Sequence, residues 1–376
     1  MRLIYFSAKR FNNFSADNAY MLALAESFRR ELKDDLLIVC ANTDERLNGY
    51  NLVNLKIKEI RGIGRLNYWL PYLVMLFWTP YFIISRKART EDDIFFLGDR
   101  ILLLYLLFWK KLFRRKFQIC SDWHMFYPSW KETFVAQHSD RLITTSEKLR
   151  QILINKAGVA VDKILTVYGG IDVDKIKPFG TGEAREALQL PAVGKLIGYI
   201  GQFKTMGMEK GLDTMIKALK FLPTDYKMIF VGGREEEIKS YQNMADAEKV
   251  AERCLFFGRK TFEEVVMFEQ ACDAVVIPYP DQPHFRDFGF PMKVYEYMAA
   301  KKPIIYSRLE LTEEVLADCG FLFTPDDAKN LAEVVQYVFA ENNRVEVGRK
   351  VANAFGKAIN YSWENKAKKI IEFIRI

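Results

Sequence analysis

Hydrophobic and polar positions along the chain form a first series of short apolar runs separated by longer amphipathic stretches. The apolar runs predict strands at residues 2–7, 36–41, 94–98, 117–121, 141–145 and 165–168. Helical periodicity between them predicts helices at residues 17–32, 102–115 and 146–156. This alternation of strand and helix is typical of a parallel sheet covered on both faces.

A second series of the same kind follows. It predicts six more short strands, at residues 195–200, 227–231, 254–257, 274–278, 303–306 and 320–323. The polar stretch 174–194, which contains Gly and Pro, separates the two series. A length of 376 residues suits two domains, which we expect at residues 1–175 and 190–359. Doubly wound sheets bind ligands at the carboxyl ends of their strands, so we expect the site to border an inter-domain cleft.

Composition excludes several classes of protein. The five cysteines contain no CxxC pair, and none of the three histidines is spaced i, i+4 from another. A zinc site, a multi-histidine metal centre and a disulfide scaffold are therefore not expected. The first residues open a buried strand rather than a signal peptide, so we expect a cytoplasmic protein.

Charge is distributed unevenly. The net charge is +7, and residues 51–150 alone carry 17 Lys and Arg against 9 Asp and Glu. Within that stretch Tyr68–Ile84 has no charged residue, two prolines interrupt it, and basic residues flank it: Arg65 before it and Arg86, Lys87 and Arg89 after it. The run is either a core helix, an interfacial helix on a membrane or a short membrane span. The basic run at 109–116 favours an anionic membrane surface, and no motif supports the alternative of nucleic acid.

The most specific constellation is the segment 287–300, DFGFPMKVYEYMAA. A strand, a polar loop, Gly289 and Pro291 precede a predicted helix that carries Lys293 and Glu296. Free N–H groups at such a helix start, together with Lys293, suit phosphate oxygens, and Glu296 suits a ribose diol. A solvated Lys–Glu pair at an ordinary helix start is the alternative.

This segment resembles the nucleotide-binding signature of GT-B glycosyltransferases, above all family 4 and its relatives. Other segments resemble the same family in the expected order: residues 139–147, 162–172, 198–201 with 209–213, and 361–364. The resemblance covers residues 120–376 well and residues 1–115 poorly. It implies two Rossmann-like domains facing across a cleft, with a last helix at about 360–376 that crosses back to the N-terminal domain.

The resemblance also implies site residues, with departures. The family often has a Glu-x7-Glu motif, but Phe288 stands eight residues before Glu296, which makes Asp287 the nearest carboxylate. Gln202 stands where Arg is frequent, and Lys204 is a candidate substitute. The implied donor nucleotide and diphosphate site comprises Gln202, Lys204, Lys210, Gly232, Arg259, Gly289, Phe290, Pro291, Met292, Lys293 and Glu296. Asp122, His124 and Asp287 are the catalytic candidates, although Asp122 and His124 can also simply cap a loop.

Taken together, the sequence predicts a glycosyltransferase that uses a nucleoside-diphosphate sugar, UDP before GDP. It is expected to need no cofactor and no obligatory metal and to act with retention of configuration, with inversion left open. The expected acceptor is lipid-linked or a saccharide, at the inner face of the plasma membrane, in surface polysaccharide or glycan assembly. A non-catalytic membrane-bound GT-B scaffold is the alternative, and the sequence predicts no oligomeric state.

Overall fold

The chain forms two compact units in the computed structural model, Met1–Gly170 with Trp363–Ile376, and Ile171–Ser362. The structure describes residues 1–11, 16–43, 45–60, 62, 64–85 and 92–376. Each unit has its own parallel sheet of α/β type, so the doubly wound architecture expected from the sequence is confirmed.

The sheet of the first unit has the strand order β3-β2-β1-β4-β5-β6-β7. Its strands are β1 (Arg2–Phe6), β2 (Leu36–Cys40), β3 (Leu52–Asn54), β4 (Asp93–Leu97), β5 (Gln118–Trp123), β6 (Arg141–Thr144) and β7 (Ile164–Thr166). Every residue of β2 and β4 is buried, as expected for parallel strands covered on both faces. The sequence did not predict β3, which has three half-buried residues at the sheet edge and no apolar run.

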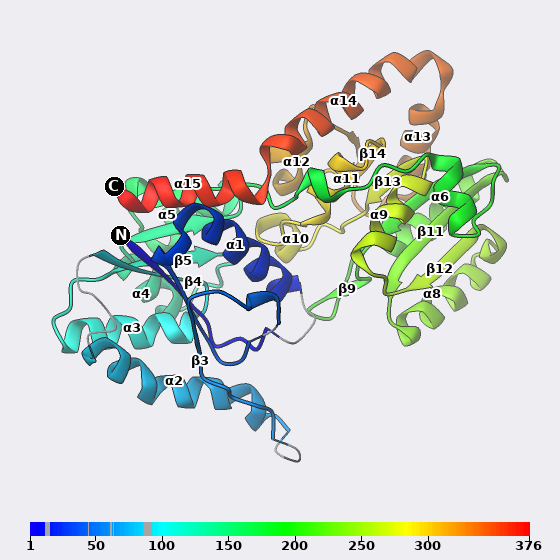
Figure 1. Ribbon diagram of the computed structural model, residues 1–376. Helices are drawn as coiled ribbons and strands as arrows, with labels where there is room; N and C mark the ends of the chain where they lie inside the picture. Colours follow the sequence, from blue (N-terminus) through cyan, green and yellow to red (C-terminus); the bar gives the residue numbers. More distant parts are fainter. Residues whose placement is uncertain (12–15, 44, 61, 63, 86–91) are drawn as a thin grey trace. The chain divides into compact units, whose positions relative to one another are not determined.

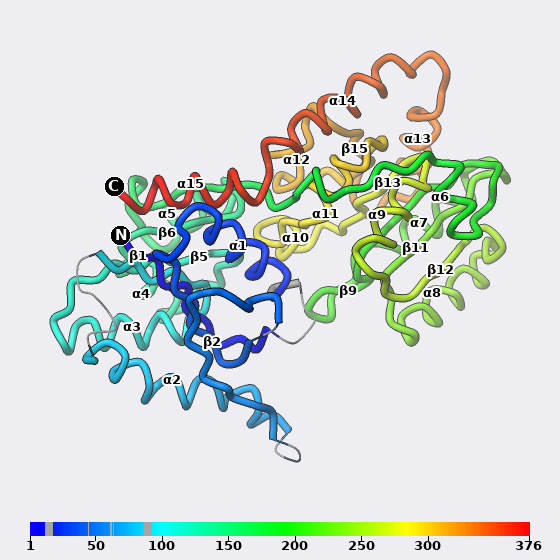
Figure 2. Tube along the Cα trace, in the orientation of Figure 1, coloured from blue at the N-terminus to red at the C-terminus, as the bar shows by residue number. Residues whose placement is uncertain are grey.

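Helices cover both faces of this sheet. They are α1 (Ala16–Leu32), α2 (Leu66–Ile84), α3 (Arg100–Leu112), α4 (Trp130–His138), α5 (Glu147–Ala157) and α15 (Trp363–Arg375). Within the first unit, Figure 1 shows α1 and α15 on one face and α2 and α3 on the other. The trace in Figure 2 follows the last helix, α15, alongside α1, which it contacts.

Helix α2 is continuous through Pro71 and Pro80, so the helix that all three alternatives for this segment required is present. Pro71 has no N–H to donate to the carbonyl of Asn67, and the Arg10 Nη1 donates to that oxygen instead, at 3.1 Å. The basic flank Arg86, Lys87 and Arg89 lies outside the described residues. In the described part of the chain no helix is both long enough and apolar enough to cross a bilayer.

The sheet of the second unit has the strand order β12-β11-β8-β13-β14-β15. Its strands are β8 (Lys195–Ile200), β11 (Tyr226–Gly233), β12 (Cys254–Gly258), β13 (Ala274–Ile277), β14 (Ile304–Ser307) and β15 (Phe321–Phe323). All six strands predicted from the second series are present. Chain order reverses at β8, whose neighbours are β11 and β13, and this is the place in such sheets where ligands bind.

The remaining elements of the second unit surround this sheet. Its helices are α6 (Thr181–Ala187), α7 (Leu212–Ala218), α8 (Glu235–Ala247), α9 (Phe262–Ala271), α10 (Pro283–Asp287), α11 (Lys293–Ala299), α12 (Glu310–Leu316), α13 (Ala328–Phe339) and α14 (Arg344–Asn360). A small antiparallel hairpin of β9 (Lys204–Thr205) and β10 (Met208–Glu209) follows β8, and the sequence did not predict it.

Candidate functional site

Glycines bring the backbone together at the carboxyl end of β8 in the second unit. Gly232, at the end of β11, has φ +113°, and a Cβ there would lie 2.6 Å from the carbonyl oxygen of Gly201. Gly211, before α7, has φ +78°, and a Cβ there would lie 1.8 Å from the carbonyl oxygen of Pro278. Larger residues at these two positions would separate the strand ends, because both the space and the left-handed conformation favour glycine.

Lys293 lies directly over the end of β8. Its side chain is buried, and Nζ donates a hydrogen bond of 2.6 Å to the carbonyl oxygen of Ile200. Nζ also lies 4.7 Å from the centroid of the Tyr199 ring. A Cβ on Gly201 would come within 1.7 Å of this Nζ, so the glycine after β8 makes room for the lysine.

Lys210 is a second buried lysine, close enough to Lys293 for their charges to interact. Burial and then the charge of Lys293 lower the pKa of Lys210 to about 7, against an opposing effect of Glu237. Burial and the charge of Lys210 likewise lower the pKa of His284. Neither lysine forms an ion pair within 4.0 Å in the described part of the chain. The carboxyl groups of Glu296 and Glu269 act on Lys293, and that of Glu237 acts on Lys210, only from beyond 4.0 Å, so a bound anion would stabilise the charged forms of both lysines.

Two carboxyl groups lie behind these lysines. Glu296 is one turn further along α11 than Lys293, and its burial raises its pKa against the opposing charge of Lys293. Glu269 on α9 is 1% exposed, and burial and then the charge of Glu296 raise its pKa well above its usual value. Glu269 was missed from the sequence, although its place between Phe268 and the buried Ala271 was a signal of burial.

The other residues expected in this site occupy different surroundings. Gln202 and Arg259 have exposed side chains, while Lys204 pairs with Glu209 across the β9–β10 hairpin. Asp287 ends α10 and lies 3.6 Å from Arg286 Nε. Gly289 adjoins the ring of His284, which a Cβ would approach to 2.9 Å. Phe290, Pro291 and Met292 lead directly into α11.

In the first unit, Asp122 and His124 lie together at the end of β5. Asp122 is 4% exposed, and its Oδ2 accepts a hydrogen bond of 3.0 Å from the Tyr20 hydroxyl. His124 Nε2 is 3.2 Å from the same oxygen, and the histidine side chain is 42% exposed. Burial alone would raise the pKa of Asp122, but His124, Lys366 and Tyr20 outweigh it and hold that pKa below its usual value. The result is a buried carboxylate behind an imidazole that solvent can reach.

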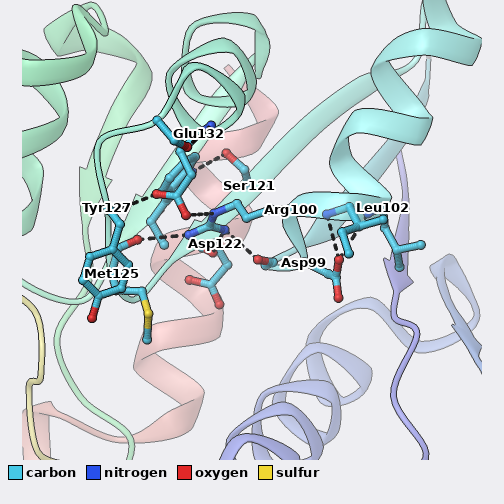
Figure 3. Close-up of polar contacts among 12 residues, drawn as sticks. Asp99, Arg100, Leu102, Ser121, Asp122, Met125, Tyr127 and Glu132 are labelled. Atoms are coloured by element: carbon cyan, nitrogen blue, oxygen red, sulfur yellow. Dashed lines mark hydrogen bonds and ion pairs between the residues drawn. The ribbon is translucent and has the colours of Figure 1, made fainter. Parts of the chain in front are cut away.

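Arg100 holds the backbone on either side of His124, a role that the sequence did not reveal. Its guanidinium lies 3.6 Å above the Trp123 ring and donates to the carbonyl oxygens of Asp122 at 3.3 Å and Met125 at 3.2 Å. Figure 3 shows Arg100 among these groups, with Asp99 beside it capping the start of α3. Planar guanidinium groups suit several fixed acceptors at once, so Arg100 fixes the position of the loop that carries His124.

No group of three or more His, Cys, Asp or Glu residues arranged to hold a metal occurs within the described ranges. The arrangement in the second unit instead offers two lysines and a glycine-lined backbone to an anion.

Comparisons with known proteins give the family of the chain. The family model for glycosyl transferases group 1 matches residues 181–358, and the model for glycosyltransferase family 4 matches residues 18–175. A D-inositol 3-phosphate glycosyltransferase of Corynebacterium urealyticum is 25% identical over 57% of this chain and 51% of its own length. The chain spans 51–58% of the length of three curated relatives, the Corynebacterium protein included.

Solved structures show the same fold. A glycosyltransferase from Rickettsia africae has a TM-score of 0.79 at 14% identity, with coverage of 100% of this chain and 98% of the other. Alr3699/HepE from Anabaena, in complex with UDP, has a TM-score of 0.75 at 16% identity over the whole of both chains. Because two glycosyltransferase models match in succession and both sheets have the matching architecture, this chain is a family 4-like glycosyltransferase of the GT-B fold.

Proposed function

We propose that this chain transfers a sugar from a nucleoside-diphosphate sugar to an acceptor hydroxyl, and that the second unit binds the nucleotide. The observation that carries the proposal is the pair of buried lysines, Lys210 and Lys293, at the carboxyl end of β8. A diphosphate would place negative charge within hydrogen-bond distance of these ammonium groups, where no carboxylate pairs with them in the described residues. UDP is favoured over GDP, with support from the UDP complex of the Anabaena protein, whose fold is similar.

The candidate site residues of the second unit have the following roles in this proposal. Lys210 and Lys293 stabilise the leaving diphosphate without an obligatory metal, and Glu296 accepts hydrogen bonds from the ribose. Asp287 contacts the donor sugar in place of the family's first Glu. Gly232 allows close approach of the nucleotide, and the surrounding positions Gln202, Lys204, Arg259 and 289–292 complete the site.

The first unit binds the acceptor in this proposal. When His124 is neutral and its Nε2 proton bonds to Asp122, its Nδ1 is left to accept a hydrogen bond from an acceptor hydroxyl. With retention of configuration, which we propose, the pair orients that hydroxyl and stabilises positive charge on the sugar. With inversion of configuration, the His124 imidazole takes the proton from the acceptor hydroxyl. The anomeric configuration of the product, read by NMR, distinguishes the two.

Replacing Glu296 by Gln should weaken nucleotide binding, because a neutral amide loses charge-assisted hydrogen bonds to the ribose diol. The loss is about 1.5–3 kcal/mol, which corresponds to about 10- to 100-fold in affinity. Isothermal titration calorimetry with UDP and GDP measures it, and Glu252→Gln, an exposed position in the same unit, is the matched control. Unchanged affinity in Glu296→Gln would remove Glu296 from the site, and a wild-type chain that binds neither nucleotide would contradict the proposed function.

We further propose that the acceptor is lipid-linked and that the first unit meets it at an anionic membrane, on the cytoplasmic side. One face of α2 packs into the core through Met75, Phe82 and Ile83. The other face exposes a stripe of apolar side chains that are 48–76% exposed, namely Leu66, Tyr68, Trp69, Leu73, Phe77, Tyr81 and Ile84. Aromatic and aliphatic side chains in such a stripe suit the interface of a bilayer.

Basic residues lie at the end of α3, in the same unit as this stripe. Helix α3 contacts α2 and exposes Phe108 and Leu112, which are 59% and 57% exposed. Lys111, Arg114 and Lys116 follow with exposed side chains. Lys110 is half-buried, and its Nζ pairs with Asp140 at 2.7 Å.

Replacing Lys111, Arg114 and Lys116 together by Ser should therefore reduce binding to anionic vesicles. At about 1 kcal/mol for each basic residue the loss is on the order of 100-fold, and binding to neutral vesicles should change little. Vesicle sedimentation measures both. The control replaces three exposed lysines of the second unit, Lys177, Lys239 and Lys329, by Ser. If the wild-type chain sediments with neither vesicle, membrane docking is wrong and a soluble saccharide becomes the better acceptor.

A further inference from the structure

The last helix of the chain carries a buried lysine into the Asp122 site. Lys366 on α15 is 2% exposed, and its Nζ donates a hydrogen bond of 2.9 Å to the carbonyl oxygen of Val167, just after β7. The same Nζ lies 5.3 Å from the centroid of the Tyr20 ring. Because the Tyr20 hydroxyl bonds to Asp122, a lysine from the C-terminus and a carboxylate from β5 belong to one cluster inside the first unit.

Asp122 is the charge partner of Lys366. Burial lowers the pKa of Lys366 to about 8, and the charge of Asp122 acts in the opposite direction. The other ionisable groups whose charges interact with Asp122 are His124 on the following loop, Tyr20 on α1, Tyr5 on β1, Cys120 on β5 and Arg100 on α3. Tyr5 and Cys120 are neutral near pH 7, since burial raises the pKa of each well above its usual value. Arg100 also faces the carboxylate of Glu132, at 3.9 Å.

One oxygen of the Asp122 carboxylate accepts no hydrogen bond from the described residues. Its Oδ2 serves Tyr20 and His124, while Oδ1 is buried and finds no hydrogen-bond partner among the described residues. A buried carboxylate in that condition depends on nearby positive charge to remain ionised. Lys366 supplies positive charge that does not vary with the protonation of His124.

We propose that Lys366 is a positioning residue of the acceptor site: its ammonium group stabilises the Asp122 carboxylate in the place where it holds His124 through Nε2 and directs Nδ1 to the acceptor hydroxyl. This rests on the proposed function for the acceptor role, but the electrostatic link from Lys366 to Asp122 and His124 does not depend on any substrate. The final helix thus takes part in the site as well as in the packing of the first unit.

The electrostatic interaction of Lys366 with Asp122 predicts a change in the surroundings of His124 near pH 8. As pH rises through that value Lys366 loses its proton, and the cation beside Asp122 disappears. The hydrogen bond between Asp122 and His124 then changes, so His124 should report the titration of a lysine. In NMR spectra of protein with labelled histidine side chains, we expect the His124 signals to shift near pH 8. His138 lies outside this cluster and should show no such step.

The decisive comparison uses Lys366→Met, with Lys369→Met as its control on an exposed position of the same helix. In Lys366→Met the step of His124 near pH 8 should vanish, kcat should fall about tenfold or more, and the alkaline limb of the kcat profile near pH 8 should be lost, while KM for the sugar nucleotide stays unchanged. Unaltered His138 and His284 signals establish that the variant is folded.

The two possible failures are distinguishable. If the wild-type His124 signals show no step near pH 8, or the step persists in Lys366→Met, the inference is wrong whether or not the chain is an enzyme. If the step behaves as expected but no sugar is transferred by the wild-type chain, the proposed function fails and the electrostatic link stands.

Discussion

Replacing Asp122 by Asn should lower turnover about 100- to 10,000-fold while leaving nucleotide binding unchanged, in keeping with the loss of a proton-transfer or orienting group. The amide retains the shape of the carboxylate but not its charge, so it no longer favours the Nε2–H form of His124. Asp122 Oδ2 accepts from both Tyr20 and His124, and the substitution changes both contacts.

Steady-state kinetics together with calorimetry check this expectation. Asp140→Asn is a control in the same unit, because Asp140 lies at the start of β6 and pairs with Lys110. If Asp122→Asn retains near-normal kcat, the carboxylate has only a structural role. If it loses nucleotide binding as well, the assignment of the nucleotide to the second unit is wrong.

Replacing Lys210 by Met should reduce turnover about 100- to 1,000-fold, because its charge acts mainly on the departing diphosphate. It should also remove a pH dependence of nucleotide binding. In the empty site the pKa of Lys210 is about 7, and a bound diphosphate raises it. Above pH 7 the wild-type chain must therefore take up a proton on binding, and its affinity should fall by up to about tenfold per pH unit.

Calorimetry of UDP binding at pH 8, in buffers of different ionisation enthalpy, measures this proton uptake. It should be present in the wild-type chain and in Lys239→Met, an exposed control, and reduced in Lys210→Met. The variant should also be at least as stable as wild type at pH 7. The folded-state pKa of Lys210 lies below its unfolded value, so burying the charged lysine lowers the stability of the folded chain at pH 7 and below. This loss becomes smaller as pH rises above 7. A variant that loses stability but keeps its turnover would contradict the role of Lys210.

Local sequence signals were sufficient for most of the fold. Apolar runs revealed all six strands of the second sheet, since parallel strands buried on both faces are continuously hydrophobic. Ser146 caps α5 by accepting from the N–H of Leu149, which explains why the predicted helix start was wrong by one residue. The sequence did not show how helix α2 accommodates Pro71, because Arg10, which donates to the carbonyl oxygen of Asn67 in its place, is remote in sequence.

Candidate site residues could be predicted from the sequence where they belong to a motif. They could not be predicted where their role depends on contacts between residues that are distant in sequence. Lys293, Glu296 and Lys210 stood in segments that resemble the family. Lys366, Arg100 and Glu269 did not, because their significance depends on neighbours from other elements. Lys366 and Asp122 are separated by most of the chain, and only the folded first unit brings α15 to β5. Periodicity places a charged residue on a helix face but cannot reveal the charge of opposite sign that it meets.

Release of nucleotide from a panel of UDP- and GDP-sugars, with and without a bacterial membrane lipid extract, tests the central claim most directly. The account predicts that the wild-type chain releases UDP from at least one UDP-sugar, that lipid extract accelerates the release, and that Asp122→Asn and Lys210→Met each slow it about 100-fold or more. Nucleotide binding without release from any sugar nucleotide, in the presence of extract, would contradict catalysis and indicate a non-catalytic scaffold.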